Sequence, residues 1–352
     1  MRSGRVVRSA QCALPYSALA NSSATGEHSC RSAPNPRCRH SVPITPYERR
    51  ITLPDGFRLA MRVWTPIDIP RGNVVIAHGL GEHAGRYGKL ASDLGDAGWE
   101  VHAADHRGHG YSPGERGAIP HPESIRDDIR ASLTFARATS PHPTVLLGHS
   151  MGGAMAAWAV AHDPSCADAL VLSSPALRTV LSAGQQLMLN TIGRLFPDLT
   201  VGNGLDADYL SHDAAVVAAY RNDPLVHDRI SSRLARSIIT AGEVTLAAAP
   251  AWRLPTIVLY AGADRIVNPR GSAEFAAAVR HPSSCAACSP SRRNNAPSSI
   301  SLRPCAASST RNFCDRSMAS LMCSSRARYV PPPATARVSP ATHQLLTPTG
   351  TL

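Results

Sequence analysis

Short apolar runs alternate with longer stretches of helical period between residues 46 and 280. Apolar runs at residues 73–77, 99–103, 144–147, 169–173 and 255–261 predict strands. The stretches at residues 86–97, 123–138, 154–162 and 270–280 predict helices. The turn sequence Pro54-Asp55-Gly56 predicts a hairpin ahead of them. Because strands and helices alternate, we expect an α/β fold with a doubly wound, mostly parallel sheet.

The pattern becomes helical between residues 175 and 250, where we expect a cap inserted at about residues 176–250. A lid helix and an ordinary core-facing helix have the same apolar spacing, so the sequence leaves both interpretations open. The residues of the predicted apolar face are Leu187, Leu189, Ile192, Leu195 and Phe196.

The pentapeptide Gly148-His149-Ser150-Met151-Gly152 lies between a predicted strand and an Ala-rich predicted helix. A serine hydroxyl is a weak nucleophile and needs a tight turn that exposes it to a base, with glycines where a side chain would clash. The helix that follows directs N–H groups and a positive dipole end toward a developing oxyanion. The pentapeptide therefore predicts a nucleophile elbow with Ser150 as the nucleophile. The alternative is a helix that merely begins with small residues.

Further motifs surround the pentapeptide in a fixed order. They are HGLGEHAGRY at residues 78–87, DHRGHGYS at 105–112, GHSMGG at 148–153, DYLSHD at 208–213 and NDPLVH at 222–227. Over roughly residues 46–280 the chain resembles the monoacylglycerol lipases and their lysophospholipase relatives, which are α/β-hydrolases with a helical cap. Five ordered motifs rarely coincide by chance.

The resemblance implies an oxyanion hole built from two backbone N–H groups, those of Leu80 and Met151, with Gly79 in the same loop. The acid of a Ser-His-Asp triad follows the nucleophile at the end of a later strand, and Asp264 has that position. The alternative for Asp264 is a loop carboxylate paired with Arg265. We expect His78 and His83 to pack or hydrogen-bond within their loop rather than contact substrate.

The triad histidine is missing from the place that the resemblance implies, roughly thirty residues beyond Asp264 and after one more strand. Only His281 and His343 follow Asp264. His281 is a weak candidate because it ends a predicted helix before another strand could return the chain to the sheet edge. His343 has no predicted strand before it. The base must come within hydrogen-bond reach of the nucleophile.

Composition changes abruptly near residue 280. Residues 281–352 contain eight arginines, one acid and five cysteines, with much Ser, Pro and Ala and no sustained helical or strand period. Such a composition cannot build a core, so we expect a disordered, low-complexity tail and a hydrolase fold whose last part is missing. An out-of-frame translation or a native insertion explains it. The Cys285-x-x-Cys288 pair is a poor metal signal because its potential partners are irregularly spaced.

Residues 1–45 likewise predict a disordered basic extension, with six arginines and one acid. These two flanks carry the excess charge behind the net charge of +11. Because that charge lies outside the predicted domain and no nucleic-acid motif is present, we expect no nucleic-acid partner.

Cys166 is the only cysteine between residues 46 and 280, which indicates a reducing compartment, and no apolar run is long enough to cross a bilayer. We therefore expect a cytoplasmic enzyme without cofactor or metal. Its expected reaction is hydrolysis of monoacylglycerol-like lipid esters through an acyl-enzyme, impaired by the absent histidine. The cap is expected to make peripheral contact with lipid surfaces. The alternatives are a lysophospholipase, a thioesterase, a serine aminopeptidase or a non-catalytic pseudo-hydrolase.

Overall fold

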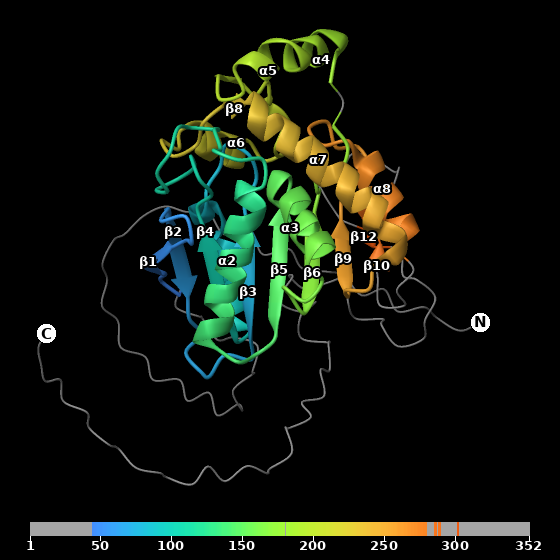
Figure 1. Ribbon diagram of the computed structural model, residues 1–352. Helices are drawn as coiled ribbons and strands as arrows, with labels where there is room; N and C mark the ends of the chain where they lie inside the picture. The colour runs from blue at the N-terminus through green and yellow to red at the C-terminus, as the bar shows by residue number, and fades with distance from the viewer. Residues whose placement is uncertain (1–43, 180, 280–284, 287, 290–300, 303–352) are drawn as a thin grey trace, which may run out of the picture. The chain divides into compact units, whose positions relative to one another are not determined.

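A computed structural model of the chain describes residues 44–179 and 181–279, together with the short segments 285–286, 288–289 and 301–302. An eight-stranded sheet lies at its centre, in the order β1-β2-β4-β3-β5-β6-β9-β10. From β4 to β10 neighbouring strands are parallel, whereas β1 and β2 are antiparallel to their neighbours. The predicted α/β class and mostly parallel sheet are confirmed (Figure 1). The strands are β1 (Tyr47–Thr52), β2 (Arg58–Trp64), β3 (Gly72–Ala77), β4 (Trp99–Ala104), β5 (Thr144–His149), β6 (Ala169–Ser173), β9 (Thr256–Leu259) and β10 (Cys285–Ala286).

Helices cover both faces of this sheet because its parallel strands are apolar on both sides. On one face Val75, Leu146 and Leu170 pack with α2 (Ser124–Thr139) and α3 (Met151–His162). On the other face Val74 and Leu147 pack with α1 (Gly88–Asp96), which follows the short helix η1 (Ala84–Tyr87). The sheet is therefore doubly wound, as the sequence predicts.

Helix α3 is buried along almost its whole length, from Met151 to Val160. Its alanines and glycines allow the close approach of β3, β5 and α7 (Ser232–Ala248). A Cβ on Gly152 would overlap the carbonyl oxygens of Ala77 and His78. The small residues thus serve packing and seat the start of α3 directly on the end of β3.

Between β6 and β9 the chain forms a mostly helical insertion, part of which lies at one end of the sheet (Figure 1). The insertion also contains a two-stranded antiparallel sheet that the sequence pattern did not predict, since each of its strands has only three residues. After it, η3 (Ala249–Ala251) and β9 lead to α8 (Pro269–Ala278). The elements of the insertion are α4 (Ala183–Asn190), α5 (Ile192–Leu195), β7 (Thr200–Gly202), η2 (Ala207–Tyr209), α6 (Ala214–Arg221), β8 (Arg229–Ser231) and α7.

The predicted apolar face on α4 and α5 lies mostly in solvent. Leu189 is buried, but Leu195 is 76% exposed and Phe196 60% exposed, and Leu187 and Ile192 are exposed as well. The interpretation of this face as an ordinary core-facing helix is therefore wrong for four of its five members.

Strand β10 extends the sheet past residue 280, in parallel register with β9. Strands β11 (Cys288–Ser289) and β12 (Ser301–Leu302) form a separate antiparallel pair. The remainder of the predicted tail, and almost all of the predicted extension at residues 1–45, lie outside the described residues. Within the described part, no helix combines the length and apolar character that a membrane span requires.

Candidate active site

Ser150 occupies a strained turn between β5 and α3. Its backbone has φ 52° and ψ −119°, in a region that residues other than glycine rarely adopt. The turn is held because Ser150 N–H donates to the Ser173 carbonyl at 3.0 Å, while the Ser150 carbonyl accepts from Ala154 and Ala176. The side chain itself is half-buried. Such a turn, at the carboxyl end of a central strand, has the geometry of a nucleophile elbow.

Gly148 and Gly79 have no side chains, which leaves room around this turn. A Cβ on Gly148 would lie 2.6 Å from the Gly152 carbonyl oxygen, closer than any side chain allows. A Cβ on Gly79 would lie 3.4 Å from Ser150 Cβ and 3.5 Å from His149 Cδ2. The loop after β3 therefore runs directly past the serine, as the expected oxyanion arrangement requires.

Leu80 and Met151 carry the two N–H groups expected to bind an oxyanion. Among the residues that the structure describes, neither of these groups donates a hydrogen bond to a backbone or side-chain acceptor. Met151 begins α3, so its N–H also lies at the positive end of the helix dipole. Both groups therefore lack a protein acceptor in the described part of the chain.

The carboxylate of Glu82 holds the loop that follows β3. Its Oε1 accepts from Gly79 N–H at 2.7 Å and from the Tyr87 hydroxyl at 2.6 Å, and its Oε2 lies 3.4 Å from Arg86 Nε. Burial, together with the negative charge of Glu82, raises the pKa of Tyr87 well above its usual value. The Tyr87 hydroxyl therefore remains a donor to the carboxylate.

His78 and His83 each make one hydrogen bond within their loop, as the sequence predicts, and one outside it, which it did not predict. His78 Nδ1 lies 2.8 Å from the Gly79 carbonyl, and His78 Nε2 lies 2.9 Å from the backbone N of His106. His83 Nδ1 accepts from Gly85 N–H, and its Nε2 lies 2.8 Å from Asp223 Oδ2 in the insertion. Neither ring hydrogen-bonds to Ser150 within the described residues.

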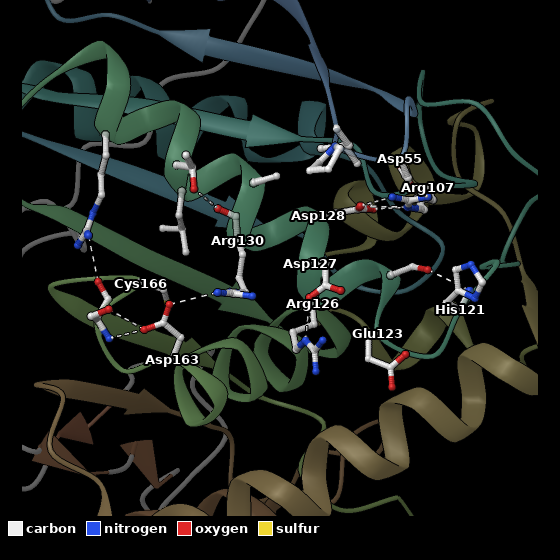
Figure 2. Close-up of a pocket in the computed structure, with 18 residues that line it drawn as sticks. Asp55, Arg107, His121, Glu123, Arg126, Asp127, Asp128, Arg130, Asp163 and Cys166 are labelled. Carbon is white, nitrogen blue, oxygen red and sulfur yellow. Dashed lines mark hydrogen bonds and ion pairs between the residues drawn. The ribbon is translucent and has the colours of Figure 1, made fainter.

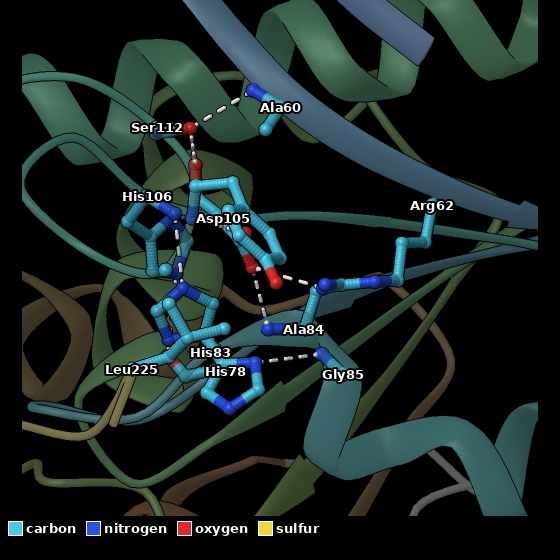
Figure 3. A network of polar contacts seen from close by, with 12 residues as sticks. Ala60, Arg62, His78, His83, Ala84, Gly85, Asp105, His106, Ser112 and Leu225 are labelled. Atoms are coloured by element: carbon cyan, nitrogen blue, oxygen red, sulfur yellow. Dashed lines mark hydrogen bonds and ion pairs between the residues drawn. The ribbon is translucent and has the colours of Figure 1, made fainter. Parts of the chain in front are cut away.

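Asp105, at the end of β4, fixes the neighbouring DHRGHGYS loop (Figure 3). Its buried carboxylate accepts from Ala84 N–H at 2.7 Å and from Tyr111 N–H at 2.8 Å. Its backbone carbonyl accepts from the hydroxyl of Ser112, which in turn accepts from Ala60 N–H. This network joins the loop that follows β3 to the loop that follows β4. Sequence reasoning missed it, although both loops belong to motifs that were singled out.

Asp264 lies in the loop that follows β9. Its Oδ1 accepts from the N–H groups of Ile266 and Val267, at 2.9 Å each, so the carboxylate orders its own turn. No ion pair joins Asp264 to Arg265 within the described residues; the Arg265 guanidinium lies over the ring of Tyr209 at 4.7 Å. The predicted alternative of an Asp264–Arg265 pair is therefore wrong.

The sheet register places Asp264 at the same edge as Ser150. His149 pairs with Ser173 across β5 and β6, and Ser173 pairs with Leu259 across β6 and β9. Ser150 directly follows the first member of this row, and Asp264 follows the last by five residues. The carboxyl ends of parallel strands are the usual place for catalytic side chains in such sheets.

No histidine takes the place of the expected base in the described part of the chain. His149, beside the serine, is engaged with the backbone carbonyl and the hydroxyl of Ser173, each 3.1 Å from its Nδ1. His281 and His343 lie outside the described residues. His281 precedes β10 in the chain, whereas the resemblance implies a base that follows this strand.

A groove of about 900 Å³ is lined in large part by residues of α2 (Figure 2). Its walls are highly charged, and within it Arg107 makes a bidentate bond to Asp128 and a further ion pair with Asp55. None of the expected catalytic or oxyanion residues lines it. Among the described residues, no cluster of His, Cys, Asp or Glu side chains is arranged to hold a metal ion.

Comparison with known proteins identifies relatives of this fold and site. The family model described as "Serine aminopeptidase, S33" matches residues 68–291, beyond the expected domain end at residue 280. The chain is 40% identical over 221 residues to a monoacylglycerol lipase of Mycolicibacterium smegmatis, covering 62% of this chain and 79% of that lipase. It is 31% identical over 223 residues to the monoglyceride lipase of Rattus norvegicus, covering 62% of this chain and 73% of the relative.

The crystal structure of Paleococcus ferrophilus monoacylglycerol lipase matches with a TM-score of 0.61 and 34% identity, covering 66% of this chain and 89% of that one. The resemblance seen in the motifs therefore extends to the fold.

Proposed function

The chain belongs to the serine aminopeptidase S33 family of α/β-hydrolases, and we propose that it is a serine ester hydrolase acting on monoacylglycerol-like lipids. The observation that carries this proposal is the position of Gly79 against Ser150, which sets the loop of Leu80 beside a strained elbow serine. Relatives named as monoacylglycerol lipases support the substrate class.

In the proposed reaction Ser150 Oγ attacks the ester carbonyl and forms an acyl-enzyme. The N–H groups of Leu80 and Met151 bind the oxyanion, and water then releases the fatty acid. Asp264 would orient a histidine base, as in the Ser-His-Asp arrangement. Gly79 keeps a side chain away from Ser150, while Gly148 and Gly152 allow the close backbone packing that seats the elbow.

Turnover by this chain is expected to be slow, because no histidine follows β10 at the position that the family arrangement requires. A serine without its base loses several orders of magnitude in rate, while the oxyanion hole and substrate binding retain a residual acceleration. A protein that binds acyl chains without turning them over is the alternative outcome. We assign the hydrolase domain to residues 46–280, with the cap at about residues 176–250.

The exposed apolar side chains on α4 and α5 support a peripheral contact between the cap and a lipid surface. Leu187, Ile192, Leu195 and Phe196 are each at least 49% exposed, which is unusual for large apolar residues gathered on two consecutive helices.

Cys166 is a free thiol, and burial raises its pKa to about 11, so it is unreactive. The absence of other cysteines between residues 46 and 280 supports a cytoplasmic location.

A panel of substrates tests the proposed substrate class. Purified full-length protein and Ser150→Ala are compared on a monoacylglycerol, a lysophospholipid, an acyl thioester and an aminoacyl amide of matched size. The proposal predicts the highest kcat/KM on the monoacylglycerol and none above background for Ser150→Ala. A preference for any of the other three would assign the chain to that reaction instead.

A further inference from the structure

Both polar backbone groups of Gly79 are held by side chains of its own loop. Its N–H donates to Glu82 Oε1 at 2.7 Å, and its carbonyl oxygen lies 2.8 Å from His78 Nδ1. The carbonyl of Gly79 belongs to the same peptide plane as the N–H of Leu80. Whatever fixes that carbonyl therefore also fixes the direction of the proposed oxyanion donor.

The hydrogen bonds of His78 define which ring nitrogen carries its proton. The backbone N–H of His106 can only donate, so His78 Nε2, 2.9 Å away, must be the unprotonated acceptor. The proton of the neutral ring then lies on Nδ1 and is donated to the Gly79 carbonyl, which can only accept. The tautomer follows from these two partners.

His78 is also kept neutral. Its side chain is fully buried, and burial, with the neighbouring His106 and His109 rings, lowers its pKa well below the usual value. The His78 and His106 rings lie 4.0 Å apart between centroids, and His106 Nε2 returns a bond to the His78 carbonyl at 3.2 Å. Asp105 anchors the loop that contains His106. The N–H of His106 is therefore held in place as the donor to His78 Nε2.

We propose that His78 is a positioning residue for ester hydrolysis, whose Nδ1–H holds the Gly79–Leu80 peptide so that Leu80 N–H faces the oxyanion formed on Ser150. The described peptide bonds are all trans, so Leu80 N–H points opposite to the Gly79 carbonyl and away from the His78 ring. A Cβ built on Gly79 would lie 3.4 Å from Ser150 Cβ, so the Gly79–Leu80 peptide runs beside the serine. The inference rests on the proposed hydrolase function and deepens it.

Two substitutions at His78 separate this role from a merely structural one. In His78→Asn the side-chain amide nitrogen takes the place of Nδ1 and can still donate to Gly79, but the bond from His106 is lost. In His78→Gln the amide reaches the place of Nε2 and can accept from His106, but the donor to Gly79 is lost. If His78 only braces the two loops against each other, His78→Gln should retain more activity than His78→Asn. If His78 positions the Gly79–Leu80 peptide, His78→Asn should retain more.

The readouts are the rate of Ser150 modification by a fluorophosphonate and, on a monoacylglycerol, kcat and KM separately. We expect His78→Gln to lower both rates by about 100-fold, with KM within about twofold, because deletion of one oxyanion donor costs about 10²–10³ in kcat. His78→Asn should retain at least about one fifth of either rate. Equal losses in the two variants, or a larger loss in Asn, would overturn the proposal.

His109→Asn is the matched control, since His109 is buried in the same cluster but donates through Nδ1 to the Arg107 carbonyl and not to the Gly79 peptide. Its labelling rate should equal that of the unaltered protein. Thermal unfolding of all three variants checks that the fold is retained.

A spectroscopic measurement decides the proposal even where the unaltered protein is inert. Long-range ¹H–¹⁵N spectra of protein containing ¹⁵N-labelled histidine report which ring nitrogen of His78 is protonated, with His78→Asn used for assignment. A proton on Nδ1 supports the proposal, and a proton on Nε2 overturns it. Failure of the hydrolase function itself would appear separately, as unaltered protein that neither labels nor hydrolyses.

Discussion

Gly79 lies so close to Ser150 that a Cβ added to the glycine would contact the serine Cβ at 3.4 Å. The two residues belong to loops that follow adjacent parallel strands, β3 and β5. Parallel pairing of those strands therefore assembles the site before any side chain contributes. The chemistry expected of Ser150 depends on the absence of a side chain at position 79.

Gly79→Ala tests that dependence. The new Cβ would lie 2.9 Å from Glu82 Oε1, which two hydrogen bonds hold in place, so the loop must shift. We expect fluorophosphonate labelling of Ser150 to slow by at least about tenfold, because displaced oxyanion donors lose alignment, and stability to fall by about 1–2 kcal/mol. Gly88→Ala, where a Cβ meets nothing within 4 Å, is the control. Unchanged labelling in Gly79→Ala would contradict the assigned oxyanion loop.

Ser150→Gly should stabilise the protein. The φ of 52° and ψ of −119° cost a non-glycine residue about 1–3 kcal/mol, and glycine removes that cost while losing about 0.5–1 kcal/mol of chain entropy. We expect the free energy of unfolding to rise by about 1 kcal/mol in urea titrations. Ser150→Ala keeps a Cβ and should show little change. Equal stabilities for the glycine and alanine variants would mean that the elbow is unstrained.

Buried neutral histidines should make the protein acid-sensitive. Burial lowers the pKa of His106 to about 4, against 6.5 for an ordinary histidine, and also lowers the pKa of His78. Between pH 6.5 and 4 the unfolded chain binds protons that the folded state does not, so the contribution is complete above pH 6.5 and is lost as pH falls toward 4. At about 1.4 kcal/mol per pKa unit, His106 alone contributes about 3 kcal/mol.

Urea unfolding at pH 7 and pH 4.5 measures this loss. His106→Gln cannot titrate, so its stability should fall less steeply over the same interval. A variant whose stability falls as steeply as that of the unaltered protein would exclude His106 as the source.

Charged residues on the cap should weaken binding to lipid vesicles. Leu195 and Phe196 are 76% and 60% exposed, and each large apolar side chain that enters a bilayer contributes about 1.5–3 kcal/mol. Leu195→Glu combined with Phe196→Glu should lower the partition coefficient into phosphatidylcholine vesicles by at least about tenfold in flotation assays. Ile67→Glu combined with Ile69→Glu is the matched control, since these side chains are 96% and 86% exposed in the loop that leads into β3. Equal effects of the two pairs would remove the cap from the contact.

Local patterns in the sequence predicted the strands and the elbow closely. The strand at residues 169–173 is predicted to the residue, and the turn at Ser150 follows from glycines whose Cβ atoms have no room. The helix expected from residue 86 instead begins at Gly88, because His83 caps a separate short helix, η1, through its ring nitrogen. Capping by a histidine has no simple sequence signal.

Contacts between distant segments could not be predicted in the same way. His78 and His106 meet only because β3 and β4 pair in parallel. Gly81 carries a positive φ of 74°, and a Cβ there would overlap the carbonyl oxygen of His227 in the insertion. Strand β10 has two residues in a stretch without any period, so only its partner β9 defines it. Such features depend on the pairing of distant segments, which local sequence patterns do not reveal.

Covalent modification by an alkyl fluorophosphonate shows whether Ser150 is the nucleophile. The full-length protein is incubated with an alkyl fluorophosphonate, digested and examined by mass spectrometry, and its thermal unfolding is followed with and without the reagent. We expect an adduct on Ser150, absent from Ser150→Ala, together with a higher unfolding temperature for the modified protein. A folded protein in which Ser150 stays unmodified at reagent concentrations that label another serine would show that Ser150 is not an activated nucleophile.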